Sequence, residues 1–242
     1  MPASSGPRVG CAGWSLPGRY ADLFGPGESM LARYATRFPV VEINSSFYRP
    51  HKPGTYERWA ASVPPGFRFS VKIPRTISHD SALVGVGPLL DRFLDDSSAL
   101  GTKLGGLLLQ LPPSLALDTR RASSFFRALR RRSGVPLVCE PRHASWFTDT
   151  ADALLLRYGV SRLGADPARV PAAAQPGGAP TWRYWRWHGA PRMYYSDYDD
   201  AALEALAAQV RHARGPRWVI FDNTAHGFAV ANAARLQERL HA

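Results

Sequence analysis

Charged side chains of the kinds used in acid–base catalysis and anion binding recur near the ends of short apolar segments. Glu42, Lys72 and Glu140 lie at such positions, and Arg186 and His188 lie two residues apart in another segment. Carboxylates and imidazoles transfer protons, and a guanidinium binds phosphate or carboxylate through two hydrogen bonds. These residue types predict an enzyme for an anionic substrate, provided that the fold brings them together.

The alternation of side chains places these groups on one face of their segments. Successive side chains of a strand point to opposite faces, and in a barrel one face points inward. In segment 40–44, Glu42 and Asn44 share the face opposite Val41 and Ile43. The same parity selects polar residues near the ends of six segments: Glu42, Asn44, Lys72, Gln110, Glu140, Arg142, Arg186, His188 and Asp222. Because burying such groups singly is costly, we expect a shared polar site; ion pairs that merely plug the barrel mouth are the alternative.

The elements that would position this site alternate regularly along the chain. Strands are expected at 8–13, 40–44, 67–72, 105–111, 136–140, 161–165, 182–188 and 217–223. Helices are expected at 28–38, 53–63, 89–100, 118–132, 149–158, 199–214 and 228–240. This pattern predicts an α/β protein that is a single (β/α)8 barrel over residues 1–242, after a short flexible leader at 1–7. The sixth unit is irregular, because 166–180 is rich in Pro, Ala and Gly, and an open doubly wound sheet is the alternative.

The amino-acid composition indicates the general class to which this protein belongs. The chain has 242 residues, a formal net charge of +11 and 45% hydrophobic residues, which is typical of a globular protein. No apolar run is long enough for a membrane span and no signal segment opens the chain, so a cytoplasmic protein without a membrane partner is expected. Cys11 and Cys139 have no second cysteine nearby and are expected to be buried thiols.

Several motifs taken in order resemble the YecE-like family, also called domain of unknown function 72. They are 10–14 (GCAGW), 42–48 (EINSSFY), 67–72 (FRFSVK), 109–114 (LQLPPS), 140–146 (EPRHASW), 186–189 (RWHG) and 221–223 (FDN), with Tyr195-Ser196 and Asn232-Ala233. The resemblance covers nearly the whole chain and implies a TIM-type barrel with a site at the motif positions, but no reaction. Asp222 departs from the pattern, since an asparagine is expected before Asn223.

The candidate residues fall into two groups. Proton transfer is assigned to Glu42, Glu140, His188 and Lys72, and Lys72 could also bind an anion, form a Schiff base or simply pair with Glu42. Substrate binding is assigned to polar and aromatic residues near the same strand ends: Trp14, Asn44, Ser46, Tyr48, Gln110, Arg142, His143, Trp146, Arg186, Asp222 and Asn223. No motif for a nucleotide cofactor is present, and no metal ligand is assigned because Glu42, Glu140, His143, His188 and Asp222 lack metal-binding spacing.

Four functions remain open at this point. The leading hypothesis is a hydrolase or isomerase for a phosphorylated or otherwise anionic polar substrate. A nucleic-acid-binding protein, with or without phosphodiester cleavage, would use the arginine excess. A glycoside hydrolase would need Glu42 and Glu140 within about 5–10 Å of each other. A non-catalytic ligand-binding barrel fits the same residues, and the sequence sets neither the oligomeric state nor the metal dependence.

Overall fold

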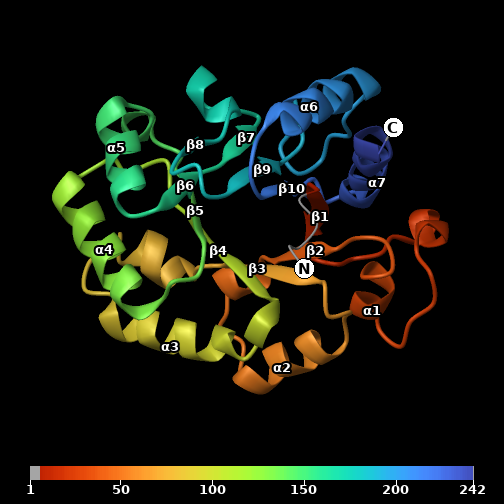
Figure 1. The fold of residues 1–242 in the computed structure, drawn as a ribbon, viewed down its shortest axis with the longest axis horizontal. Helices are drawn as coiled ribbons and strands as arrows, with labels where there is room; N and C mark the ends of the chain where they lie inside the picture. Colours follow the sequence, from red (N-terminus) through yellow and green to blue (C-terminus); the bar gives the residue numbers. More distant parts are fainter. Residues whose placement is uncertain (1–5, 242) are drawn as a thin grey trace.

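Parallel strands line the inside of the computed structural model, which describes residues 6–241 (Figure 1). In hydrogen-bonded order the sheet runs β7-β9-β10-β1-β2-β3-β4-β5-β6-β8. The strands are β1 (Arg8–Ala12), β2 (Val40–Ile43), β3 (Arg68–Lys72), β4 (Leu104–Gln110), β5 (Leu137–Glu140), β6 (Val160–Arg162), β7 (Gly164–Asp166), β8 (Gly177–Gly178), β9 (Arg183–Trp187) and β10 (Arg217–Phe221). The sheet is a nearly closed barrel, so the predicted fold class is confirmed and the open doubly wound alternative is not.

The sixth unit closes the barrel in two pieces. The segment expected as one strand at 161–165 is divided at Leu163 into β6, which pairs with β5, and β7, which pairs with β9. The following loop holds a short 3-10 helix, η6 (Pro171–Ala174), and the two-residue strand β8, which pairs antiparallel with β6. The irregularity expected here is confirmed, but β8 was not predicted, because two glycines carry no strand pattern.

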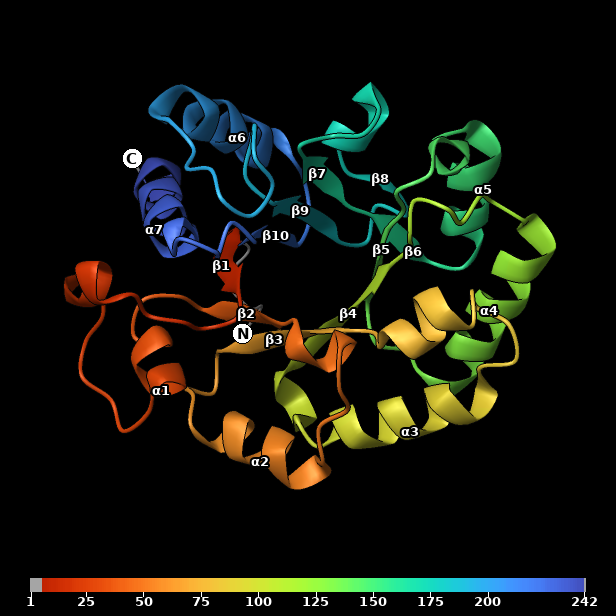
Figure 2. The same ribbon diagram turned by 180° about the vertical axis from the view of Figure 1, so that it is seen from behind.

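The α-helices lie outside the strands, as both views show (Figures 1 and 2). Between Gly6 and His241 there are seven of them. They are α1 (Met30–Tyr34), α2 (Pro53–Ala61), α3 (Gly87–Ser98), α4 (Thr119–Arg132), α5 (Asp149–Arg157), α6 (Asp200–His212) and α7 (Phe228–His241). Short helical turns follow several strands, among them the 3-10 helix η2 (Ser45–Phe47) and the π-helix η3 (Thr76–Asp80). Helices were expected to begin at Asp118 and Asp199, and the side chains of these residues accept backbone N–H bonds at the starts of α4 and α6. At the start of α5 the capping residue is Thr148 rather than Asp149.

Side-chain parity along the strands divides the core into two layers. Val41 and Ile43 belong to the layer between strands and helices, and Val40 belongs to the cluster inside the barrel. Trp182, Tyr184 and Trp218 fill the interior below the polar residues, with ring centroids 4.9 Å apart for Trp182 and each of the other two. The barrel interior is therefore packed, and its polar groups lie toward the C-terminal ends of the strands.

Three further expectations concern features away from the barrel mouth. Both cysteines are free and buried, as predicted, and burial raises the pKa of both thiols. None of the helices between Gly6 and His241 is long and apolar enough to cross a membrane. The first five residues of the predicted leader lie outside the described residues.

Candidate functional site

The barrel brings together the charged residues that the sequence had spread over more than 180 positions. Glu42 lies on β2, Lys72 and Glu140 end β3 and β5, and Arg186 lies on β9. His188 and Asp222 directly follow β9 and β10, and parallel strands align these ends at one opening. The predicted convergence is therefore present in the structure.

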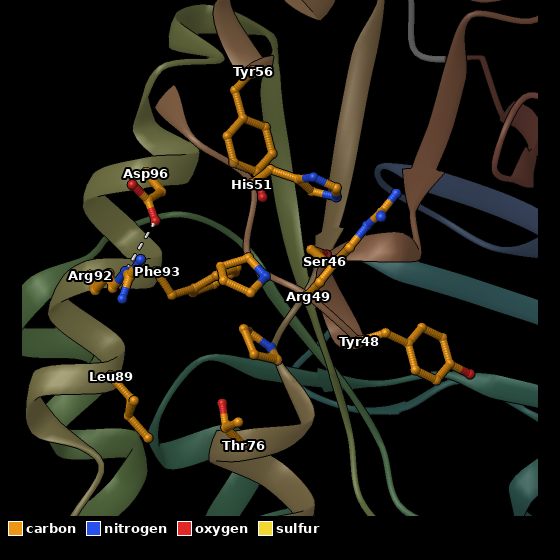
Figure 3. Close-up of a pocket in the computed structure, with 12 residues that line it drawn as sticks. Ser46, Tyr48, Arg49, His51, Tyr56, Thr76, Leu89, Arg92, Phe93 and Asp96 are labelled. Atoms are coloured by element: carbon orange, nitrogen blue, oxygen red, sulfur yellow. Dashed lines mark ion pairs between the residues drawn. The ribbon is translucent and has the colours of Figure 1, made fainter. Parts of the chain in front are cut away.

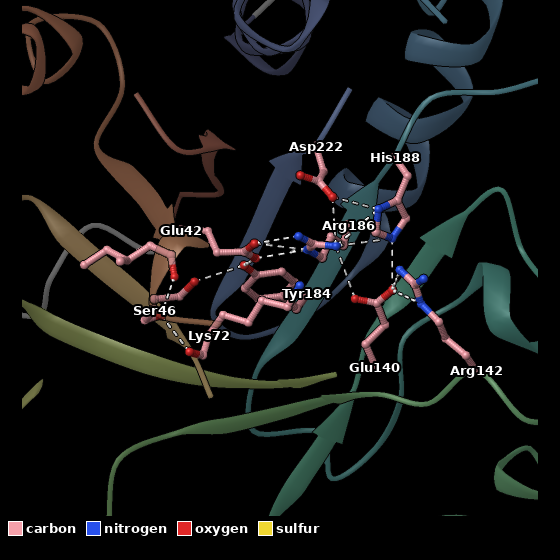
Figure 4. Close-up of polar contacts among 11 residues, drawn as sticks. Glu42, Ser46, Lys72, Glu140, Arg142, Tyr184, Arg186, His188 and Asp222 are labelled. Carbon is pink, nitrogen blue, oxygen red and sulfur yellow. Dashed lines mark hydrogen bonds and ion pairs between the residues drawn. The ribbon is translucent and has the colours of Figure 1, made fainter. Parts of the chain in front are cut away.

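Arg186 is the centre of this cluster and is almost fully buried, with 1% of the residue exposed (Figure 4). Its Nη2 donates to Glu42 Oε1 at 2.7 Å, and its Nη1 lies 3.0 Å from Asp222 Oδ2 and 3.4 Å from Glu140 Oε2. Burial lowers the pKa of Arg186, but the three carboxylates outweigh it and raise that pKa well above its usual range. The guanidinium is thus a permanent cation that holds three strand ends together.

His188 lies between two of the same carboxylates. Its Nε2 is 3.0 Å from Glu140 Oε1 and its Nδ1 is 3.0 Å from Asp222 Oδ2. Both ring nitrogens can donate only in the imidazolium form. Burial opposes the charged form of His188, but the neighbouring Glu140 raises the pKa of His188 above its usual value. Burial also opposes the charge of Glu140, yet Arg142 and His188 hold the pKa of Glu140 well below its usual range. We therefore take His188 to be charged in this arrangement.

Lys72 is the one member of the cluster whose charge has no carboxylate partner among the described residues. Glu42 pairs with Arg186 and accepts a 2.8 Å hydrogen bond from Tyr184 Oη, so the expected alternative of a Glu42–Lys72 pair is not formed. The Lys72 ammonium lies 4.1 Å from the centre of the Phe47 ring, and 4% of the residue is exposed. Burial, and next the charge of Arg186, lower the pKa of Lys72 to about 8.

The charges of the cluster balance without Lys72. Glu42, Glu140 and Asp222 supply three negative charges, and Arg142, Arg186 and protonated His188 supply three positive ones. Arg142 completes the set by donating to Glu140 Oε1 at 2.9 Å from its Nη2. Lys72 is therefore a surplus cation held in a poorly hydrated place, which favours either an added anion or loss of its proton.

Little free space remains beside the buried pairs. A cavity of about 20 Å³ touches Glu140, Arg142 and His188, which is room for about one water molecule. Tyr194 lies edge-on to His188, with ring centroids 5.8 Å apart, and it has a left-handed backbone with φ of 71°. With 37% of the residue exposed, Tyr194 lies at the surface of the site.

Other predicted site residues on the β2 and β4 side lie around the cluster but make different contacts. Ser46 Oγ donates to the backbone oxygens of Ile43 and Lys72, and Gln110 is buried at the end of β4. Asn44 Oδ1 is buried with no hydrogen-bond partner within the described chain. Tyr48 is 72% exposed, and its ring packs edge-on against that of Phe47, with ring centroids 5.0 Å apart.

The remaining predicted binding residues serve the loops or the core. Trp14 packs edge-on against Trp59, with ring centroids 5.0 Å apart. His143 Nδ1 accepts from the Ser145 N–H and so caps a short helix. Trp146 is 1% exposed and its indole N–H donates to the Leu115 carbonyl. In this conformation Trp146 offers no surface to a ligand. Asn223 is also buried, and its Nδ2 donates to Ser196 and Asn232.

Two residues near the cluster were not singled out from the sequence. Tyr184 shares the inward parity of Arg186 and His188, and this signal was available. His79 lies in the π-helix η3, with its ring centroid 5.0 Å from that of Phe47, the ring that Lys72 contacts. Burial, and then the charge of Lys72, lower the pKa of His79. No strand pattern covers η3, so no signal in the sequence pointed to His79.

The arrangement also bears on metal and sugar chemistry. Between Gly6 and His241, no group of three or more His, Cys, Asp or Glu side chains is placed to hold a metal ion. The Arg186 guanidinium contacts both Glu42 and Glu140, the two carboxylates that a glycoside hydrolase would use. In this state the two carboxylates are committed to Arg186.

The cluster predicts a stability maximum in mildly acidic solution. The pKa values of Glu140 and Asp222 are lower in the folded protein than in the unfolded chain, where they are about 4. Their contribution to the free energy of unfolding is therefore complete above the unfolded pKa and is lost as pH falls through the folded pKa. Because the pKa of His188 is raised, its contribution is present below the unfolded value of about 6.5 and is lost as pH rises through the folded value.

We therefore expect the free energy of unfolding in urea to peak between about pH 5 and 6.5. Comparison with His188→Gln isolates the contribution of the histidine between about pH 6 and 7, where Lys72, with a pKa of about 8, still keeps most of its charge. A wild-type decline over this range that persists unchanged in His188→Gln would contradict the assignment of a charged His188.

Comparison with known proteins agrees with this fold. Residues 8–242 match the family described as "Protein of unknown function DUF72". UPF0759 protein YecE of Escherichia coli K12 is 31% identical over 159 residues, covering 65% of this chain and 56% of that protein. UPF0759 protein YunF of Bacillus subtilis is 26% identical over 58% of this chain and 52% of that protein. The matched region thus spans about half the length of these curated relatives.

Solved structures show the same barrel. A DUF72 family protein from Thermotoga maritima has a TM-score of 0.81 at 23% identity and covers 98% of this chain and 100% of its own. A DUF72 family protein from Enterococcus faecalis has a TM-score of 0.81 at 20% identity and covers 99% of both chains. An AP endonuclease of family 2 from Brucella melitensis has a TM-score of 0.51 at 13% identity, covering 93% of this chain and 96% of its own. At these identities the likeness concerns the fold alone.

Proposed function

This chain belongs to the DUF72 family of proteins of unknown function, and we propose that it is an enzyme acting on a small phosphorylated or otherwise anionic polar substrate at the barrel mouth. The observation that carries the proposal is the Lys72 ammonium, which has no carboxylate partner among residues 6–241 and lies beside a cluster whose other charges already cancel. Lys72 lies at the C-terminal end of a barrel strand, where barrel enzymes place their chemistry.

The contacts divide the roles among the predicted residues. Glu42, Arg186 and Asp222 are positioning residues, because each is held by charge partners inside the barrel. Lys72, together with the partly exposed Arg142, would hold the anion. Lys72 has a pKa of about 8, close to the pH at which an enzyme works, and so is also the group best suited to exchange a proton. Tyr194, which is 37% exposed at the surface of the site, would turn aside to admit the substrate.

Sulfate tests the anion site without a change in its own charge between pH 6 and 10. We expect sulfate binding, measured by calorimetry at pH 6.5, to weaken at least about ten-fold in Lys72→Met, because a charge-assisted hydrogen bond is lost. In the wild type, affinity should fall as pH rises through 8, where Lys72 loses its charge. Lys52→Met is the matched control, since Lys52 precedes α2 outside the cluster.

The same variants decide between binding and turnover. A panel of sugar phosphates followed by phosphorus NMR should show either free phosphate, for a hydrolase, or a shifted ester resonance, for an isomerase. Lys72→Met should remove this turnover and Lys52→Met should retain it. Sulfate affinity and its pH dependence that are the same in Lys72→Met as in the wild type would refute the proposed anion site.

Nucleic-acid binding is the second candidate, and one surface favours it. Arg120, Arg127 and Arg157 line a groove between α4 and α5, and none of them has a carboxylate partner among residues 6–241. Binding of a single-stranded oligonucleotide there would weaken steeply with salt, with a log–log slope of about two to three for three phosphate contacts. A flat salt dependence, or no loss of affinity in Arg127→Gln, would contradict this candidate.

A further inference from the structure

A second cavity lies outside the barrel mouth, between the loops that follow β2 and β3 and one side of α3 (Figure 3). Its volume is about 220 Å³. An apolar cavity of about 150 Å³ accepts benzene. The space is therefore large enough for one six-membered ring that carries a short substituent.

The lining of this cavity is mostly apolar and aromatic. Leu89 is 40% exposed at the edge of the cavity, whereas the ring of the 72% exposed Tyr48 points away from Leu89 (Figure 3). Tyr56 and Phe93 are buried, and Pro50 and Pro74 complete the apolar part of the wall. Exposed apolar surface gathered around a concavity is typical of a ligand site.

The polar part of the lining has a net positive charge. Arg92 pairs with Asp96 at 3.8 Å across one turn of α3. Arg49 has no carboxylate partner within the described part of the chain, and its side chain is exposed. His51 accepts or donates a 2.8 Å hydrogen bond with Ser45 Oγ, and burial followed by the charge of Arg49 lowers its pKa, so it adds no charge near neutral pH. One unpaired guanidinium therefore remains beside an apolar space.

The helix η2 separates this cavity from the barrel mouth. Phe47 of η2 contacts the Lys72 ammonium on one side. Ser46 and the following Tyr48 line the cavity on the other side. The two sites share a wall and no charged residue, so a ligand of one does not need to touch the other.

We propose that this cavity is a binding site for a small organic monoanion with a flat apolar ring, such as an aryl carboxylate. The ring lies against Leu89 and Phe93, and the anionic group pairs with Arg49. The site is independent of the anion site proposed for Lys72, because it is built from different side chains.

Phenylacetate is the probe and 2-phenylethanol is its uncharged counterpart. We expect calorimetry or ligand-detected NMR to show phenylacetate binding to the wild-type protein about five-fold more tightly than 2-phenylethanol, as for one exposed ion pair. Arg49→Gln should remove this preference and leave 2-phenylethanol binding unchanged. Arg131→Gln is the matched control, since Arg131 is an exposed arginine on α4.

A substitution that fills the cavity tests where the aromatic ring of the probe binds. Leu89→Trp should weaken both probes at least about ten-fold, because the larger side chain occupies the cavity. Leu156→Trp, at a 59% exposed leucine on α5, should bind both as the wild type does. Lys72→Met should retain phenylacetate binding even if it loses sulfate, which keeps the two proposals distinguishable.

Three results would each overturn this inference. They are no detectable binding of either probe, equal affinity for the two probes in the wild type, and phenylacetate binding that survives Leu89→Trp but is lost in Lys72→Met. The last result would place the ring at the barrel mouth. Circular dichroism of each variant distinguishes a filled cavity from a misfolded protein.

Discussion

Replacing Arg186 with Met is expected to lower the free energy of unfolding by about 3–5 kcal/mol, because removing one partner of a buried ion pair leaves the other uncompensated. Three carboxylates are affected here: Glu42, Glu140 and Asp222 all lie within 3.4 Å of the guanidinium. Methionine keeps much of the side-chain volume, so the loss reports charge and hydrogen bonding rather than a cavity. Urea unfolding at pH 7 measures it.

Two further variants make this result interpretable. Arg131→Met, at an exposed position on α4, should change the free energy of unfolding by less than about 0.5 kcal/mol. If Arg186→Met does not fold, Glu42→Gln is the milder test, because it keeps the shape of the side chain and removes one charge. A change below about 1 kcal/mol in both Arg186→Met and Glu42→Gln would show that the carboxylates are not held by Arg186.

Gly10→Ala is expected to have the second large effect, a loss of about 3 kcal/mol or more, because an added methyl group meets rigid backbone. The new Cβ would lie against the Val40 carbonyl oxygen and 2.8 Å from Tyr34 Oη. Tyr34 Oη accepts from the Cys11 N–H and donates to the same carbonyl, so it ties β1 to β2. The substitution would separate the strands that place Glu42 in the site.

Gly18→Ala is the matched control for this substitution. Nothing lies within 4 Å of the Cβ that would be added at Gly18. Its midpoint of thermal unfolding should stay within about two degrees of the wild type, whereas that of Gly10→Ala should fall by about six degrees or more. Equal behaviour of the two variants would mean that β1 and β2 can move apart without cost.

Most of the barrel was predictable because its strands and helices differ in the period of their apolar residues. Parity alone placed Glu42, Arg186 and His188 on one inward face, and the helix boundaries fell within a few residues of the observed ones. The break at Leu163 and the strand β8 were not predictable, because they depend on how the last strands meet across the barrel. Closure is a tertiary effect with no local signal.

The contacts within the site were less predictable than its location. Adjacent strands suggested that Glu42 would pair with Lys72, but Arg186 reaches Glu42 from β9 across the barrel interior. Arg186 and Glu42 are 144 residues apart in the sequence, so no local pattern could predict their contact. For His143 and Trp146 the error was of another kind. Their positions near Glu140 in the sequence suggested ligand binding, but the His143 side chain caps a short helix and the Trp146 side chain is buried in the core.

The ion pairs of Glu140 also change the result expected for Glu140→Gln. From the sequence alone, Glu140→Gln is expected to abolish turnover with little change in melting temperature. The structure shows Glu140 bonded to Arg142, Arg186 and His188, so its loss of charge should also destabilise the protein. Lys72→Met is the cleaner test of function, because Lys72 has no carboxylate partner among residues 6–241 to leave unpaired.

The pKa of the Lys72 ammonium tests the central claim most directly. The chain has three lysines, Lys52, Lys72 and Lys103, so protein labelled with carbon-13 lysine should give three Cε resonances, with Lys72→Met identifying the one of interest. Titration by NMR is predicted to show a midpoint near 8 for Lys72. A midpoint at or above its ordinary value of 10.5 would show a hydrated or paired ammonium, and would contradict the account of Lys72 as a buried surplus cation.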